Sequence, residues 1–228
     1  MTGSVTGSVS GGGGRCQTVL SPQGVRGGLM VDVIVNPRAR QAEKVPPWQR
    51  LDSTAVHTTS WFEVRHDSVI RPDGCCDTYV HVVAPGSVTV LAMDHHGRIM
   101  LTRQWIYTHE STQWRLPGGG VEQGDSDALA AARRELAEET GLDAARWELL
   151  GQIHGADSLS NHVDRIFLAT DLNSGEQRLN PGEADLQVHW MSFDSALDLV
   201  LSGELPHAGS AYAILLMAVS GSRADTRR

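Results

Sequence analysis

The most constraining feature of this 228-residue chain is the run Arg134-Glu135-Leu136-Ala137-Glu138-Glu139-Thr140-Gly141-Leu142, which ends a predicted helix. At about 100° per residue, Glu135, Glu138 and Glu139 fall within an arc of roughly 100° on one helix face. Carboxylates at this spacing repel one another, and the helix dipole is also negative at this end. Arg134 can offset Glu138 four residues on, but the remaining charge requires another cation. The run is therefore either a solvated acidic helix end or a cation-binding site.

Three consecutive glycines, Gly118–Gly120, precede that helix in a predicted loop and favour the cation-binding site. Glycines let the backbone approach a ligand closely, and a free carbonyl in this loop can complete the ligand shell of a metal. Oxygen-only ligands select a hard divalent ion, Mg²⁺ or Mn²⁺, and Mg²⁺ prefers to share its shell with substrate phosphates and water. The pattern therefore predicts a metal site for a phosphate-bearing substrate.

The formal charge of −8, from 19 basic and 27 acidic side chains, argues against a general nucleic-acid-binding protein. It does not exclude a small anionic substrate, because a bound cation inverts the local electrostatics. No apolar run approaches the ~20 residues of a membrane-spanning helix, and no signal peptide is visible. The cysteines Cys16, Cys75 and Cys76 match neither a disulfide framework nor a zinc spacing and indicate reduced thiols. We expect a cytoplasmic protein without nucleic-acid or membrane partners.

Composition changes along the chain divide it into four expected segments. These are a Gly/Ser-rich tail and proline-containing linker at 1–47, an N-terminal β unit at 48–85, the main domain at 86–220 and a C-terminal tail at 221–228. Met1 and Met30 both remain candidate starts of the native chain. Strand patterns with few helices between them predict a mixed α/β or α+β fold.

Local patterns predict the individual elements of these segments. Strands are expected at Ser53–Thr58, Trp61–Ile70, Asp77–Val83, Ser87–Met93, Ile99–Trp105, Trp147–His154, Val163–Asp171 and Val188–Ser192. Turns are expected at Arg71–Gly74 and Asp94–Gly97. Helices are expected from near Asp125–Asp127 to Gly141, over Asp194–Leu201 and over His207–Val219.

The glycine loop followed by Arg134–Leu142 resembles the Nudix box. The consensus is Gly, five residues, Glu, seven residues, then Arg-Glu-apolar-x-Glu-Glu-x-Gly-apolar, and the second half matches at every fixed position. The first half departs, because counting back along the chain places the consensus Glu on Ser126 and the consensus Gly on Gly120. We prefer an alignment on Gly119 and Asp125 with one extra residue, since a loop absorbs one residue easily and Asp125 keeps the carboxylate.

The resemblance implies a Nudix fold, in which a mixed β-sheet lies between helices, and hydrolysis of a nucleoside diphosphate linked to another group. Carried over by position, Glu135 and Glu139 are the principal metal ligands and Glu138 is a further ligand or the base. Arg134 orients the glutamates, and the carbonyl of Gly118 adds a ligand. In the implied mechanism Mg²⁺, or alternatively Mn²⁺, neutralises the diphosphate and activates a water for attack on phosphorus.

The resemblance extends over roughly residues 48–217 and is strongest to the ADP-ribose pyrophosphatase group. The segments that carry it are the N-terminal β unit with Trp61-Phe62, Leu101–Trp105, Arg165–Ala169 and Val188–Met191. The N-terminal strands of that group often pair across a homodimer, so we expect a homodimer. The expected substrate-binding residues are Arg103, Arg115, Gly119 and Gly120.

Several positions depart from that group. Asp157 and Ser158 replace a usual Pro, His162 replaces a usual loop Glu, and Arg115 replaces the Glu before the Leu-Pro of the glycine loop. His162 is either a catalytic base, since histidine accepts protons at neutral pH, or an exposed histidine without a role. Asp157 and Asp164 are expected to be solvated loop acids.

Three other side chains have two interpretations each. Arg103 forms either a surface salt bridge or a diphosphate contact, and Arg115 is a candidate partner of a substrate phosphate. Trp105 and Trp114 serve either in packing or as platforms on which a nucleobase stacks.

Three functions remain open. The first is divalent-metal-dependent hydrolysis of ADP-ribose or a related nucleotide-sugar. The second is hydrolysis of another diphosphate, such as a mononucleotide, a dinucleoside polyphosphate or a prenyl diphosphate. The third is a nucleotide sensor without hydrolysis, against which the intact glutamates argue, because a sensor does not need them.

Overall fold

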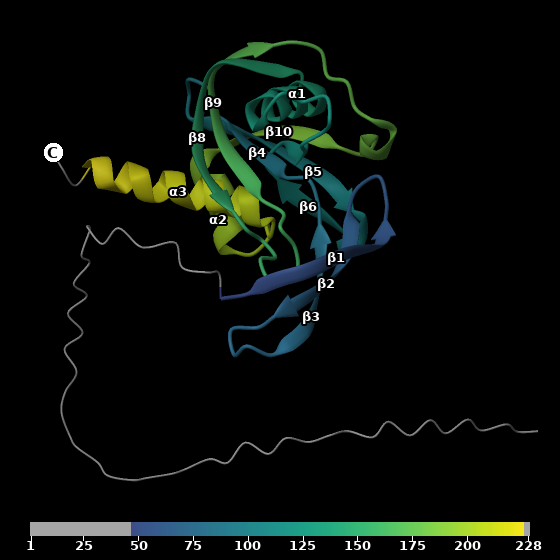
Figure 1. Cartoon of the computed structure of the whole chain (residues 1–228). Helices are drawn as coiled ribbons and strands as arrows, with labels where there is room; N and C mark the ends of the chain where they lie inside the picture. Colours follow the sequence, from purple (N-terminus) through teal and green to yellow (C-terminus); the bar gives the residue numbers. More distant parts are fainter. Residues whose placement is uncertain (1–46, 226–228) are drawn as a thin grey trace, which may run out of the picture. The chain divides into compact units, whose positions relative to one another are not determined.

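The computed structural model describes residues 47–225, so the expected tail and linker lie, apart from residue 47, outside the described residues. Figure 1 shows the strands and helices of this part of the chain. The strands are β1 (Gln49–Thr58), β2 (Glu63–Ile70), β3 (Cys76–Val83), β4 (Ser87–Ala92), β5 (Arg98–Ile106), β6 (Ser111–Arg115), β7 (Gly118–Gly120), β8 (Leu142–Ile153), β9 (Asp164–Ser174) and β10 (Gln187–Ser192). The α-helices are α1 (Ala128–Thr140), α2 (Phe193–Leu201) and α3 (Ala208–Asp225).

The N-terminal strands form an antiparallel sheet in the order β1-β2-β3. The turn between β2 and β3 needs a glycine, because Gly74 has a φ of 82° and donates its N–H to the Arg71 carbonyl at 2.9 Å. β3 also contacts the loop before β9, since the Val82 N–H donates to the Leu159 carbonyl at 2.8 Å. This sheet is therefore hydrogen-bonded to the loop that leads into the main sheet.

The main sheet has the order β7-β4-β9-β8, with β4 and β9 parallel and the other pairs antiparallel. Alternate side chains of β4 point to opposite faces: Val88 and Val90 pack with Leu136 of α1, whereas Leu91 packs with Ile214 of α3. The sheet therefore lies between α1 on one face and α2 and α3 on the other. The predicted fold class, a mixed sheet between helices, is confirmed.

The remaining strands form a sheet in the order β10-β5-β6. Strand β6 was not predicted from the sequence. The segment Gly118–Gly120 was predicted to be a loop. The three glycines instead form the short edge strand β7, in which Gly118, Gly119 and Gly120 pair with Thr89, Val88 and Ser87. β8 begins at Leu142, five residues before the predicted strand, and α3 continues to Asp225. In the described part of the chain, no helix is long and apolar enough to cross a membrane.

Candidate active site

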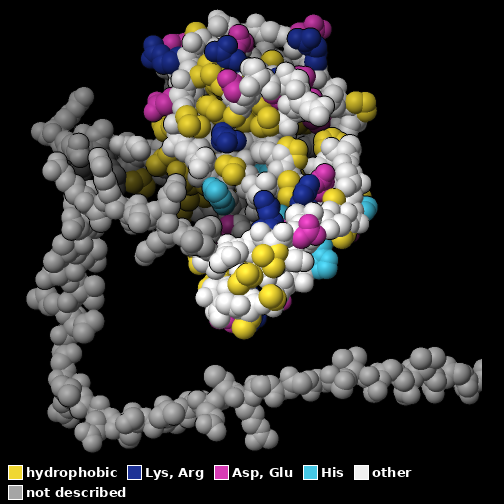
Figure 2. Space-filling model, viewed as in Figure 1, with side chains coloured by type: hydrophobic (Ala, Val, Ile, Leu, Met, Phe, Trp, Pro, Cys, Tyr) yellow, Lys and Arg dark blue, Asp and Glu magenta, His cyan; other side chains and the backbone are white. Residues whose placement is uncertain are grey.

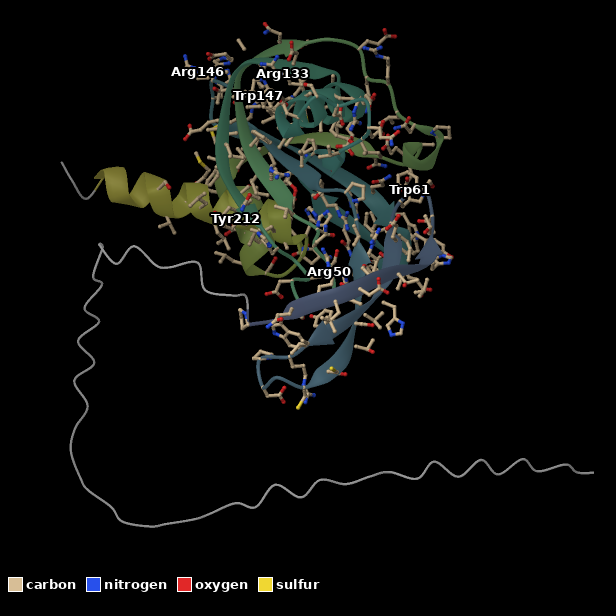
Figure 3. The ribbon with its side chains drawn as sticks, in the orientation of Figure 1. Arg50, Trp61, Arg133, Arg146, Trp147 and Tyr212 are labelled. Carbon is tan, nitrogen blue, oxygen red and sulfur yellow. The ribbon has the colours of Figure 1, made fainter. Side chains whose placement is uncertain are left out.

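Helix α1 holds the acidic run in place through a cap at each end. The Asp127 side chain accepts the Ala130 N–H at 2.8 Å, and Gly141 adopts a left-handed φ of 69° and donates to the Ala137 carbonyl. On another face of the helix Arg133 lies over Trp147 of β8, with its guanidinium carbon 5.8 Å from the ring centre (Figure 3). Both predicted helix boundaries are confirmed.

Glu135 lies directly against the backbone of β7. Only 6% of the residue is exposed, and a Cβ added to Gly119 would lie 2.6 Å from Glu135 Cδ. Burial raises the pKa of Glu135, an effect that the charge of Arg134 opposes. A side chain at position 119 would therefore displace this carboxylate.

Glu139 lies one turn further along α1 and contacts the first glycine of β7. Its Oε2 accepts the Gly118 N–H at 2.9 Å. A Cβ at Gly118 would lie 3.0 Å from Thr89 Cα, so the strand requires glycine there. Burial raises the pKa of Glu139 to about 8, although the Gly118 hydrogen bond opposes the shift. The neighbouring Glu135 charge adds to the rise, so the two carboxylates repel each other.

Arg134 connects the acidic residues to the glycine strand. It donates to both carboxylate oxygens of Asp125, at 3.1 and 3.0 Å, and to the Gly120 carbonyl at 2.8 Å. It also contacts Glu135 at 2.9 Å and Glu138 at 3.2 Å. Its hydrogen bond to Asp125 is the main reason why its pKa is raised. The hydrogen-bonded pair of Arg134 and Asp125 supports the alignment that preferred Asp125.

Glu138 differs from the other two glutamates, because its side chain is about a third exposed and bonds to Arg134. Within residues 47–225, no three acidic, histidine or cysteine side chains converge closely enough to hold a metal by themselves. The close donors are two buried carboxylates beside glycine backbone. This donor set fits a hard divalent cation whose remaining ligands are substrate phosphates and water.

Arg115, at the end of β6, lies close enough to Glu139 for their charges to interact. Burial lowers the pKa of the guanidinium, and the Glu139 carboxylate opposes that shift. Its Nη2 donates to Gln113 at 3.3 Å, while its buried Nε has no hydrogen-bond partner among the described residues. The Arg115 guanidinium, which was predicted to bind substrate, is therefore close enough to interact with the charge of Glu139.

The other predicted site residues, Arg103, Trp105 and His162, have partners other than the three glutamates. Arg103 of β5 is exposed and lies over Trp114, 5.4 Å from the ring centre. Trp105 is half exposed, and its backbone N–H donates to Asp185 Oδ2 at 2.8 Å. His162 lies in the loop before β9, where its backbone N–H donates to Ser160 Oγ at 3.1 Å.

Glu183 was not among the site residues predicted from the sequence. The connection from β9 to β10 runs along the end of α1, where the Gln177 amide donates to the Glu139 carbonyl at 2.6 Å and the Arg178 N–H donates to the Glu138 carbonyl at 2.9 Å. The Glu183 charge adds to the burial effect that raises the pKa of Glu139, so the two carboxylates lie close enough for their charges to interact. The run Asn180-Pro181-Gly182-Glu183 has the pattern of a capping box, which the structure forms.

The expectation that Asp164 is a solvated loop acid was wrong. Asp164 is the first residue of β9 and only 6% exposed, and its Oδ2 accepts the Thr89 hydroxyl at 2.8 Å. It lies beside half-buried His207, whose pKa is lowered mainly by burial. The sequence around each residue has no signal for this pairing, because it forms only when β4, β9 and α3 pack together.

Comparisons with known proteins match this architecture. The family model for the NUDIX domain matches residues 84–210, and that for the nucleoside diphosphate sugar hydrolase N-terminal domain matches residues 48–82. The chain is 33% identical over 159 residues to an ADP-ribose pyrophosphatase of Mycobacterium tuberculosis, covering 69% of this chain and 77% of the relative. It is 31% identical over 149 residues to an ADP-ribose pyrophosphatase of Bacillus subtilis, covering 65% and 80% respectively.

A solved structure shares the fold. The crystal structure of an ADP compounds hydrolase superposes with a TM-score of 0.66 at 21% identity, covering 78% of this chain and 95% of that one.

Proposed function

The chain belongs to the Nudix family of pyrophosphatase hydrolases and is related to ADP-ribose pyrophosphatases, and we propose that it hydrolyses the diphosphate bond of ADP-ribose or a related nucleotide-sugar. The products are a nucleoside monophosphate and a sugar phosphate. The observation that carries the proposal is the pair of buried carboxylates, Glu135 and Glu139, held against Gly118 and Gly119.

Glu135 and Glu139 hold a divalent cation, Mg²⁺ or Mn²⁺, in this proposal, together with the Gly118 carbonyl. Their raised pKa values support this, because two ionised carboxylates repel each other in a buried position unless a cation neutralises them. When bound, the cation supplies positive charge for the diphosphate oxygens and acidifies water. Glu138 is a further ligand or the base, and its carboxylate accepts a hydrogen bond from Arg134.

Glu183 is the candidate general base for the attacking water. Its charge acts on both buried glutamates, and it lies on a connection hydrogen-bonded to the end of α1. His162 stays an alternative base. Arg115 and Arg103 bind the anionic substrate, and the backbone of Gly119 and Gly120 lets it approach closely.

A homodimer through the N-terminal sheet completes the proposal. Figure 2 shows hydrophobic side chains on the lobe that β1–β3 form, and Figure 3 places Trp61 and Arg50 on this unit. Trp61 is 77% exposed, and Val56 on the edge strand β1 is 57% exposed. An edge strand with exposed apolar side chains favours pairing with another chain.

The direct test is a panel of diphosphates incubated with the full chain and Mg²⁺ or Mn²⁺, with products identified by mass. ADP-ribose should give AMP and ribose 5-phosphate. Faster cleavage of a mononucleotide, dinucleoside polyphosphate or prenyl diphosphate would favour the second function. Tight nucleotide-sugar binding without cleavage of any compound would contradict the hydrolase and favour a sensor.

A further inference from the structure

The first turn of α3 meets the backbone that carries the site, from the sheet face opposite α1. Ser210 is fully buried, and its Oγ accepts the Leu116 N–H at 2.8 Å. The same Oγ lies 2.9 Å from His207 Nδ1. Gly118 lies two residues after Leu116, and its N–H donates to Glu139 at 2.9 Å. A short path of hydrogen bonds and backbone therefore joins α3 to Glu139.

The first turn approaches this closely because position 209 is a glycine. A Cβ there would collide with Asp164 Oδ2 and the Thr89 hydroxyl and would lie 3.3 Å from His207 Cε1. The hydrogen bond between Asp164 and Thr89 is itself buried. The first turn of α3 thus packs against buried polar groups. Apolar side chains would fill the same space without the free-energy cost of burying polar groups.

We propose that Ser210 and His207 are positioning residues, which hold the Leu116–Gly118 segment and through it the carboxylate of Glu139. This inference rests on the proposed function, because it assigns these residues a role in the same site. The Pro117 carbonyl accepts the Val90 N–H at 2.8 Å, so β4 fixes the segment on one side and Ser210 fixes it on the other.

Removing the Ser210 hydroxyl leaves the Leu116 N–H without an acceptor in a buried position. The segment then shifts or recruits water, and the Gly118 N–H no longer meets Glu139 in the same geometry. Small displacements of a catalytic group reduce turnover strongly, whereas substrate contacts elsewhere are unchanged. Arg115 is the residue before Leu116, and its charge acts on both His207 and Glu139. The same shift of the backbone therefore also moves the Arg115 guanidinium.

The test compares Ser210→Ala with Ile214→Val in the full chain. Ile214 lies one turn further along α3, is fully buried and belongs to the apolar cluster that includes Leu91, so its truncation reports packing alone. Thermal unfolding of both variants measures the loss of stability. Binding of Mn²⁺ without substrate, followed by electron paramagnetic resonance, is measured beside kcat and KM.

We expect Ser210→Ala to lower kcat and Mn²⁺ affinity by about 10-fold each, with KM for the diphosphate within about two-fold, because loss of a group that orients a metal ligand has effects of this size. Ile214→Val should lose stability and keep both properties. Wild-type kcat and Mn²⁺ affinity in Ser210→Ala, or equal losses in the two variants, would overturn the inference.

His207 provides a second test if Ser210→Ala does not fold. His207→Asn keeps a polar atom near the Nδ1 position, so it should retain more kcat and Mn²⁺ affinity than His207→Ala. Equal values in these two variants and the wild type would contradict the positioning role. Absence of both Mn²⁺ binding and hydrolysis in the wild-type chain would instead contradict the proposed function.

Discussion

Glu135 and Gly119 occupy adjacent space so tightly that position 119 admits no side chain. A Cβ there would lie 2.6 Å from Glu135 Cδ, and the carboxylate is buried and bonded to Arg134 at 2.9 Å. The φ of Gly119 lies outside the left-handed region, so backbone conformation does not require a glycine there. Glycine is required because any side chain would collide with Glu135, a proposed metal ligand.

Gly119→Ala should therefore reduce Mn²⁺ affinity and kcat by at least about 10-fold, because the added methyl group displaces Glu135. The control is Gly124→Ala, since Gly124 has no atom within 4 Å of its added Cβ and an ordinary φ. Titration calorimetry with Mn²⁺ and steady-state kinetics measure both effects. Equal behaviour of the two variants would show that Glu135 does not need its present position.

The raised pKa of Glu139 predicts how stability changes with pH when divalent metal is removed by a chelator. The pKa is about 8 in the folded chain and 4.5 ordinarily, so the folded state binds this proton more tightly. The stabilisation is full below about pH 4.5 and is lost as the pH rises through about 8. The melting temperature at each pH measures this change in stability. The variant Glu139→Gln is the control, because its amide does not titrate.

The wild-type melting temperature should fall relative to that of Glu139→Gln between about pH 5 and about pH 9. Added Mg²⁺ should restore it at the higher pH, because the cation binds the ionised carboxylate. A difference that is constant with pH would mean that Glu139 titrates in its ordinary range.

Glu183→Gln and His162→Gln test the two candidate bases that lie outside α1. Loss of a general base lowers kcat by about 10² to 10⁴-fold, and we expect this for Glu183, whose charge acts on both buried glutamates. His162→Gln should change kcat by less than about three-fold. Rates for both variants are compared at several pH values, and a large loss in His162→Gln alone would reverse the assignment.

The proposed dimer predicts a mass in solution of twice the 24.6 kDa chain. Val56→Glu, on the edge strand β1, should shift the protein toward the monomer, because a charge on that edge opposes strand pairing. Leu149→Glu is a matched control, since Leu149 on β8 is 56% exposed and Val56 is 57% exposed. Light scattering coupled to size exclusion measures both. A monomeric wild type, or equal effects, would refute the interface.

Helix α1 could be predicted because its signals are local. Asp127 and Gly141 cap it, and Leu136 carries its buried stripe. The short strand at Gly118–Gly120 could not, because glycine has no strand preference and its pairing with β4 depends on the packed sheet.

The same reason explains the site residues that were missed. Glu183 lies 44 positions after Glu139, and His207 lies 43 positions after Asp164. Only tertiary packing brings these residues to the site or its supporting network. Arg115, one position before Leu116, was predicted from a departure in the glycine segment, and its charge interacts with that of Glu139.

In the proposed function, diphosphate hydrolysis depends on the cation that the buried pair Glu135 and Glu139 holds. The most direct measurement is turnover of ADP-ribose with Mg²⁺ by the wild-type chain and by Glu139→Gln, with products identified by mass. The wild type should release AMP and ribose 5-phosphate, and Glu139→Gln should be slower by at least about 10²-fold, since a lost metal ligand removes several kcal/mol of transition-state stabilisation. Equal rates in the two proteins, or no cleavage by the wild type, would contradict the claim.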